Sequence, residues 1–175
     1  CKKDEIARPA SGYFLKANIG GQDYQVTDQQ MFNTFQYTDE DGCISTKRYT
    51  YANISQIETT NFFFDLYIKH YEKEVDFMGS QTGRKDVHSD SDDVGTICNL
   101  DLTVLYQNKA DSQWYLPTNQ RPINVNVTKI TKTAETSTYV KYDIEGDFDF
   151  QLLVLNTTTY IPVTGTYRTW IEVLK

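Results

Sequence analysis

The sequence lacks long apolar runs and has no excess of basic residues. Its purely apolar runs are only a few residues long, whereas a membrane-spanning helix needs about 20. The 175 residues include 17 Lys and Arg against 24 Asp and Glu, which gives a net charge of −7. Nucleic-acid binding depends on a basic surface that attracts phosphates. The sequence therefore predicts no membrane-spanning helix and no nucleic-acid partner.

The chain is also poor in the residues that nucleophilic catalysis uses. It contains two histidines, His70 and His88, and neither lies in a nucleophile-elbow or papain-like context. His70 ends an apolar segment, where a histidine with a solvent-exposed tip is the commoner arrangement. We therefore expect a protein that is not an enzyme and that has no cofactor.

Alanine and leucine, which fill helices, are sparse, while threonine, tyrosine, valine and isoleucine are abundant. This is the composition of β-strands, and it contains enough apolar residues to exclude wholesale disorder. Residues 13–19 and 23–27 alternate with period two around Gly20-Gly21, which predicts a hairpin. Similar alternation over further segments predicts strands: residues 43–51, 60–70, 97–106, 123–131 and 165–174.

The clearest strand signal covers Tyr139–Val154. Apolar residues and one glycine occupy every second position, and charged or amide residues occupy the positions between them from Lys141 to Gln151. A helix would scatter both sets around its circumference, so the segment must be a strand. Gly146 is expected to mark a bend or bulge within it. A shift in apolar phase between Val127 and Ile130 predicts another bulge.

Nine or ten strands without a βαβ spacing predict an all-β fold, most simply an antiparallel β-sandwich. A jelly-roll or immunoglobulin-like sandwich and a lipocalin-like barrel are the alternatives. Residues 79–95 and 109–122 are expected to be loops, and residues 31–37 are ambiguous. Residues 1–11 are polar, which predicts a flexible tether. The remaining residues, 12–175, are expected to form a single domain.

Three cysteines leave one thiol unpaired if the other two form a disulfide. A bond between Cys43 and Cys98 would close a loop of 55 residues and contribute about 4 kcal/mol in the chain-entropy model. The alternative is two buried free thiols that behave as small apolar residues.

The chain begins Cys1-Lys2-Lys3-Asp4-Glu5, which resembles a mature bacterial lipoprotein with a lipidated Cys1. The run Lys3-Asp4-Glu5 is similar to the export signal of surface lipoproteins of the Bacteroidetes. The segments 14–24 and 146–167 resemble the opening and closing strands of small uncharacterised lipoproteins from that group. These resemblances imply a β-sandwich lipoprotein held by its lipid in the outer membrane and exposed at the cell surface.

Two acidic groups are candidates for chemistry. Four carboxylates and one histidine crowd a loop, where the carboxylate oxygens are candidates for binding Ca²⁺. Their spacing does not match an EF-hand, and a solvated loop is the alternative: Asp86, His88, Asp90, Asp92 and Asp93. Four more carboxylates alternate along one strand face: Asp143, Glu145, Asp147 and Asp149. We interpret them as a solvent face neutralised across the strands by Lys141, Arg168 or Lys129, with general acid–base chemistry as the alternative.

Aromatic residues beside amides and charges suggest sugar binding, which uses a flat apolar ring and directional hydrogen bonds. Trp170 falls on the outward face beside Arg168, and Trp114-Tyr115 lie in an amide-rich segment. The alternative is that both tryptophans fill cores. We expect a surface-anchored lipoprotein that binds an extracellular ligand, with a glycan as the first candidate. The alternative function is a structural or assembly lipoprotein of the cell envelope with protein partners.

Overall fold

The computed structural model describes residues 12–27, 35–38, 49–77, 82–84, 87–89, 100–112, 114–117, 124–154 and 157–175. They include one short helix, α1 (Glu74–Phe77), and no helix among them is long and apolar enough to cross a membrane. The described strands are β1 (Phe14–Ile19), β2 (Gln22–Thr27), β3 (Phe35–Thr38), β4 (Tyr49–Glu58), β5 (Phe62–Tyr71), β6 (Gly83–Arg84), β7 (Val87–Ser89), β8 (Leu100–Asn108), β9 (Trp114–Pro117), β10 (Asn124–Glu135), β11 (Tyr139–Val154) and β12 (Tyr160–Leu174).

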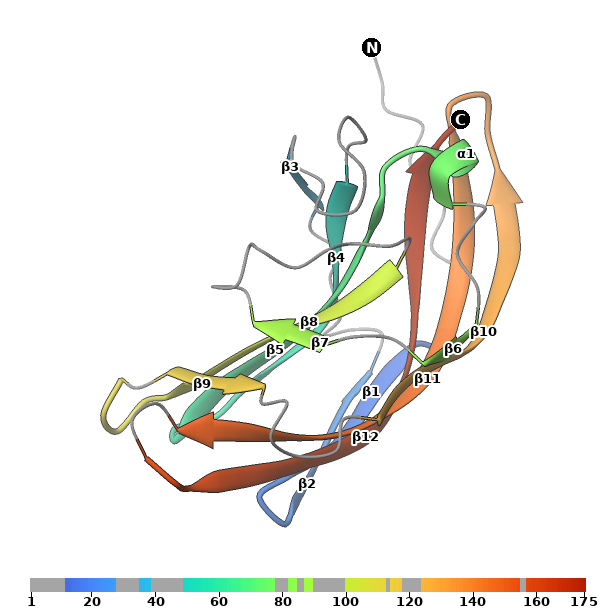
Figure 1. Ribbon diagram of the computed structural model, residues 1–175. Helices are drawn as coiled ribbons and strands as arrows, with labels where there is room; N and C mark the ends of the chain where they lie inside the picture. Colours follow the sequence, from blue (N-terminus) through green and yellow to red (C-terminus); the bar gives the residue numbers. More distant parts are fainter. Residues whose placement is uncertain are drawn as a thin grey trace.

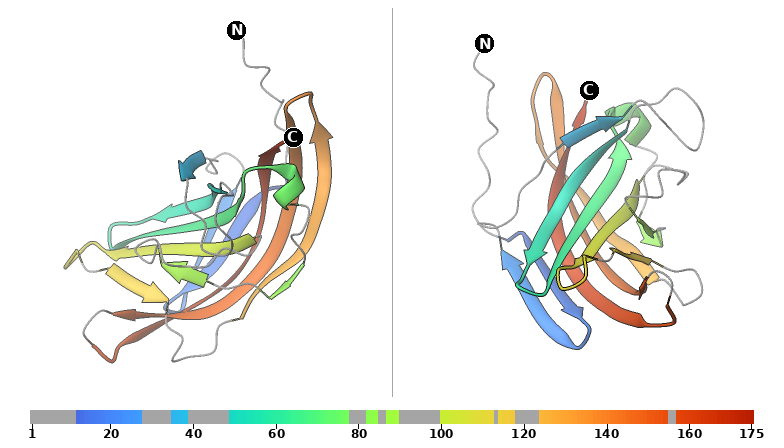
Figure 2. Two further views of the ribbon diagram at one scale, coloured as in Figure 1. Left: turned by 45° about the horizontal axis from the view of Figure 1, so that its top comes forward. Right: turned by 90° about the vertical axis from the view of Figure 1, so that its left-hand side faces the viewer.

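Nine strands form one hydrogen-bonded path in the order β2-β1-β12-β11-β9-β8-β5-β4-β3. Strand β10 pairs with β11 outside this path, β6 pairs with β10, and β7 pairs in parallel with β8. The long strands β10, β11 and β12 are bowed, and the β4, β5 and β8 strands lie on their inner side (Figures 1 and 2). The prediction of an all-β, antiparallel, sandwich-like fold is confirmed.

The predicted hairpin at the start of the described chain is confirmed. Strands β1 and β2 pair from Ile19 and Gln22 outward, so the turn consists of Gly20 and Gly21 alone. Their φ angles are +60° and +89°, and a two-residue turn of type I′ needs positive φ at both positions. The Asn18 side chain accepts a hydrogen bond from Gly21 N and donates one to Asp23.

The core lies between the two layers and is built from the alternating faces that the sequence predicts. In β5 the buried face contains Phe62, Phe64, Leu66 and Ile68, and in β12 it contains Tyr167, Thr169, Ile171 and Val173. Every second side chain of β11 from Val140 to Leu152 is buried against them. Burial of these aromatic and branched side chains is the main stabilising contribution to the fold.

Gly146 has a different role from the predicted bend within its own strand. It pairs with Tyr167 of β12, and a Cβ atom at Gly146 would lie 2.6 Å from the Tyr167 ring. Gly165 of β12 likewise pairs with Phe148 of β11, whose ring covers it. Each glycine therefore makes room for an aromatic ring from the neighbouring strand.

The predicted bulge is confirmed in β10, where the register shifts between Val127 and Lys129.

His70 is the clearest error of the sequence-based assignment in the core. Its side chain is fully buried, with its ring centroid 5.9 Å from that of Phe77, instead of reaching solvent. Burial lowers the pKa of His70 to about 4, so the ring is neutral at pH 7. The neutral ring donates from Nδ1 to the Tyr71 carbonyl oxygen over 2.7 Å.

Several predicted boundaries change. The expected loop over residues 109–122 contains strand β9, which pairs with both β8 and β11. The expected loop over residues 79–95 contains the short strands β6 and β7. The ambiguous segment 31–37 overlaps strand β3, and the strand expected over 43–51 overlaps β4, which continues to Glu58.

Candidate binding face

The site is built on the side of β11 and β12 that points away from the core, which we call the outer face. Strict alternation places Lys141, Asp143 and Glu145 of β11 on it, together with Arg168 and Trp170 of β12. Lys141 and Asp143 are only 2% and 7% exposed. The interpretation of this side as a simple solvent face is therefore wrong at these two positions.

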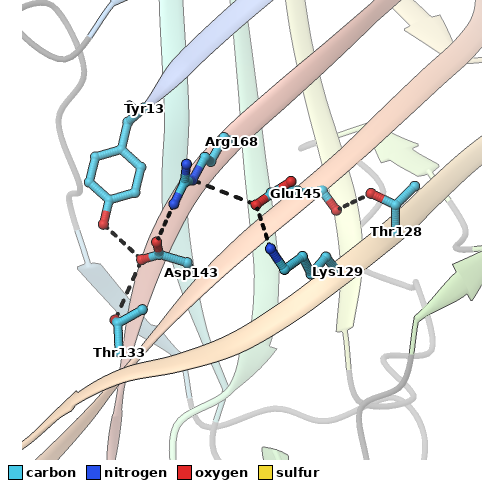
Figure 3. A network of polar contacts seen from close by, with 7 residues as sticks. All are labelled: Tyr13, Thr128, Lys129, Thr133, Asp143, Glu145 and Arg168. Atoms are coloured by element: carbon cyan, nitrogen blue, oxygen red, sulfur yellow. Dashed lines mark hydrogen bonds and ion pairs between the residues drawn. The ribbon is translucent and has the colours of Figure 1, made fainter. Parts of the chain in front are cut away.

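Asp143 is the centre of the polar network in Figure 3. Its Oδ1 accepts a hydrogen bond of 2.7 Å from the Tyr13 hydroxyl and one of 3.5 Å from the Thr133 hydroxyl. Its Oδ2 accepts a hydrogen bond of 3.1 Å from Arg168 Nη2. This bond raises the pKa of Arg168 further above its ordinary value, so the guanidinium stays charged. A buried carboxylate needs such partners because it has lost its water.

Glu145 extends the network toward solvent. It lies 3.7 Å from Arg168 Nε and 3.5 Å from Lys129 Nζ (Figure 3). The backbone oxygen of Glu145 accepts a hydrogen bond from the Thr128 hydroxyl. Arg168 and Lys129 thus pair with the acidic strand face as the sequence predicts. These exposed ion pairs contribute little to stability, but they fix the direction of the charged groups.

Lys141, which the sequence-based interpretation made a counter-ion of the acidic face, contacts two aromatic rings. Its ammonium lies 4.3 Å from the ring centroid of Trp170 and 5.5 Å from that of Tyr13. The Arg168 guanidinium also lies 5.9 Å from the Tyr13 ring centroid. Cation–π contacts of this kind hold a ring in one orientation.

Two partly exposed aromatic residues of the outer face, Phe14 and Trp170, lie next to Arg168. Phe14 pairs directly with Arg168 across β1 and β12, and Trp170 lies two residues farther along β12. Arg168 is therefore flanked by one ring on the neighbouring strand and one on its own strand. Apolar rings beside fixed, directional donors and acceptors suit the binding of a sugar, which has both C–H faces and hydroxyl groups.

The four aromatic and basic residues predicted to bind ligand do not form one surface. Arg168 and Trp170 lie together, but Trp114 and Tyr115 belong to β9. Tyr115 pairs with Val154 and Trp170 pairs with Asp143, so eleven residues of β11, roughly 36 Å of strand, separate them. Tyr115 is buried in the core, 4.8 Å from the Tyr106 ring, and its hydroxyl accepts a hydrogen bond from Asn108.

The other predicted positions contribute nothing to the described site. Cys1, Cys43 and Cys98 lie outside the described residues, as do Asp86, Asp90, Asp92 and Asp93. His88 is in β7, opposite Thr103 of β8. Within the described ranges, no three His, Cys, Asp or Glu side chains are grouped so that they could hold a metal ion.

Tyr13, Phe14 and Thr133 belong to the site and were not predicted from the sequence. The alternation over residues 13–19 was the available signal, because it separates Phe14 from the core-facing Leu15. It does not say which strand lies beside β1, and this pairing brings Phe14 to Arg168.

No protein family model, no curated protein sequence and no solved structure matches this chain. The chemistry of the outer face is therefore the basis for a proposal about function.

Proposed function

We propose that this domain binds an extracellular glycan on its outer face, at Trp170, Phe14 and Arg168. The observation that carries the proposal is the pair of partly exposed rings flanking a guanidinium whose position is fixed by Asp143. A sugar ring would stack on the Trp170 side chain, and Arg168 and Glu145 would hydrogen-bond its hydroxyl groups. Rigid strands and an internal ion-pair network reduce the conformational entropy that binding must remove.

The affinity of one such site should be weak. Each stacking contact contributes about 0.5–1.5 kcal/mol, which is consistent with a Kd of roughly 10⁻⁵ to 10⁻³ M for a single sugar unit. The sequence-based hypothesis of a lipid on Cys1 fits this weakness. Many copies anchored at the surface of one cell would bind one polymer together and gain avidity without further contacts.

The alternative function, a structural or assembly protein of the envelope, calls for a different surface. A protein partner would favour a contiguous exposed apolar patch. Among the described residues, Val75 of α1 is the one large apolar side chain that is strongly exposed, at 77%. The described surface therefore favours the glycan proposal over the structural one.

The test is a glycan array followed by calorimetry on the purified domain. Trp170→Ala and Phe14→Ala should each weaken binding by about three- to tenfold, the loss of one stacking contact. Val75→Ala is the control and should bind like the parent protein, because helix α1 packs against Tyr142 on the core-facing side of β11 and not on the outer face. Circular dichroism must show that the variants remain folded. Binding that is unchanged in Trp170→Ala, or absent in the parent protein, would overturn the proposal.

A further inference from the structure

Strand register extends the outer face far beyond Trp170. The strands β10, β11, β12, β1 and β2 lie side by side, and their outward residues align in rows across the sheet. The first row contains Lys129, Glu145, Arg168, Phe14 and Thr27. The second row contains Asn126, Asp147, Thr166, Lys16 and Gln25. The third row contains Asn124, Asp149, Thr164, Asn18 and Asp23.

The second and third rows are open to solvent. Seven of their ten residues are exposed and the other three are partly exposed. Two hydrogen bonds between their side chains run along the rows, from Asn126 to Asp147 over 2.9 Å and from Asn18 to Asp23 over 2.7 Å. These bonds orient amide and carboxylate groups that still face water. Hydroxyl, amide and carboxylate groups together offer the mixture of donors and acceptors that sugar hydroxyls require.

The size and charge of this surface define its ligand. Thr164 lies six residues from Trp170 along β12, which is about 20 Å of strand and longer than one sugar ring. The three rows contain three cations, Lys16, Lys129 and Arg168, against four carboxylates, so the surface is almost neutral. A polyanion or a polycation would find no complementary potential on it.

We propose that the outer face binds an extended, uncharged polysaccharide chain that runs along β11 and β12 from Trp170 toward Asp149 and Thr164. This inference rests on the proposed function, and it adds the length and the charge of the ligand. The surface lies on the outer side of the bowed strands β11 and β12 in Figure 1, away from the β4, β5 and β8 strands, so both strands present it along their length.

The probes are oligosaccharide ladders of glucose, mannose and galactose from one to six units, with oligogalacturonates of matched length as the charged series. Calorimetry should show that affinity for at least one neutral ladder rises with length. The double variant Asp149→Ser/Thr164→Ala should lower affinity for the hexasaccharide by about three- to tenfold and leave the disaccharide unaffected. Thr158→Ala, in the exposed turn between β11 and β12, is the control and should change neither.

The outcomes separate the two proposals. Trp170→Ala should weaken binding of short and long oligosaccharides alike. If affinity does not depend on length, or if the double variant binds the hexasaccharide normally, the extended surface is wrong while the site at Trp170 stands. Tighter binding of the oligogalacturonates would overturn the assignment of an uncharged ligand. If Trp170→Ala has no effect on any ladder, the proposed function itself fails.

Discussion

Tyr13 and Asp143 are 130 residues apart in the sequence, and the Tyr13 hydroxyl donates a hydrogen bond of 2.7 Å to the Asp143 carboxylate. This contact holds the residue that precedes β1 against the outer face of β11. It also covers part of Asp143, which is why a carboxylate on the side away from the core is only 7% exposed. The binding face and the start of the fold are thus connected through one side chain.

Removing this hydroxyl should destabilise the domain. Hydrogen bonds to charged groups contribute about 1.5–3 kcal/mol, so Tyr13→Phe should lower the free energy of unfolding by about 2 kcal/mol in urea titrations. Tyr24→Phe is the control, because its hydroxyl bonds to Gln22 at an exposed position, and it should change stability by less than about 0.5 kcal/mol. If the two variants have the same free energy of unfolding, the Tyr13 hydrogen bond does not contribute to stability.

The buried His70 should make stability depend on pH. Its pKa in the folded state is about 4, against 6.5 for the unfolded chain, so between these values the unfolded state binds more protons. The free energy of unfolding should therefore fall as pH decreases from 6.5 to 4, by about 3 kcal/mol from this residue alone. His70→Gln should remove that part of the slope. Parallel stability curves for the two proteins between pH 7 and pH 4 would contradict the assignment.

Removing the hydroxyl of Tyr167 from the core should not destabilise the domain. Its hydroxyl is fully buried and has no hydrogen-bond partner among the described residues, and burial raises the pKa of Tyr167 well above its usual value. Tyr167→Phe should leave stability unchanged or raise it by up to about 1 kcal/mol, because a desolvated polar group is removed. The matched variant is Tyr142→Phe, which loses a 2.8 Å bond to the Glu74 carboxylate and should be about 1.5–2 kcal/mol less stable. Thermal unfolding distinguishes the two variants. A marked loss of stability in Tyr167→Phe would mean that the Tyr167 hydroxyl of the parent protein forms a hydrogen bond in solution.

The sequence predicts the strands whose two faces differ in polarity. In β11 the alternation separates core and outward side chains correctly, because a period of two is a local property of the chain. Strand β9 was missed because it has four residues, Trp114–Pro117, and ends in a proline. It is a strand because β8 and β11 supply its hydrogen-bond partners, and these lie elsewhere in the sequence.

The candidate site was also predicted only in part, because its residues meet through strand pairs that are distant in the sequence. Alternation placed Arg168 and Trp170 on one outward face, as the structure has them. It does not determine that Tyr13 covers Asp143, or that Trp114 and Trp170 align with opposite ends of β11. Local pattern thus identified two members of the face, and strand pairing decided which other residues joined them.

The pairing of β1 with β12 also sets the order in which the domain is completed. The β1–β2 hairpin on its own is at best marginally stable, and its next hydrogen-bonded neighbour begins at Tyr160. During synthesis β1 therefore gains this neighbour only after β12 has been made, about 140 residues later in the sequence. Contacts over such long sequence distances slow folding and keep strand edges exposed in the meantime. The edge of β1 that pairs with β12 therefore stays open until residues 160–174 have been synthesised.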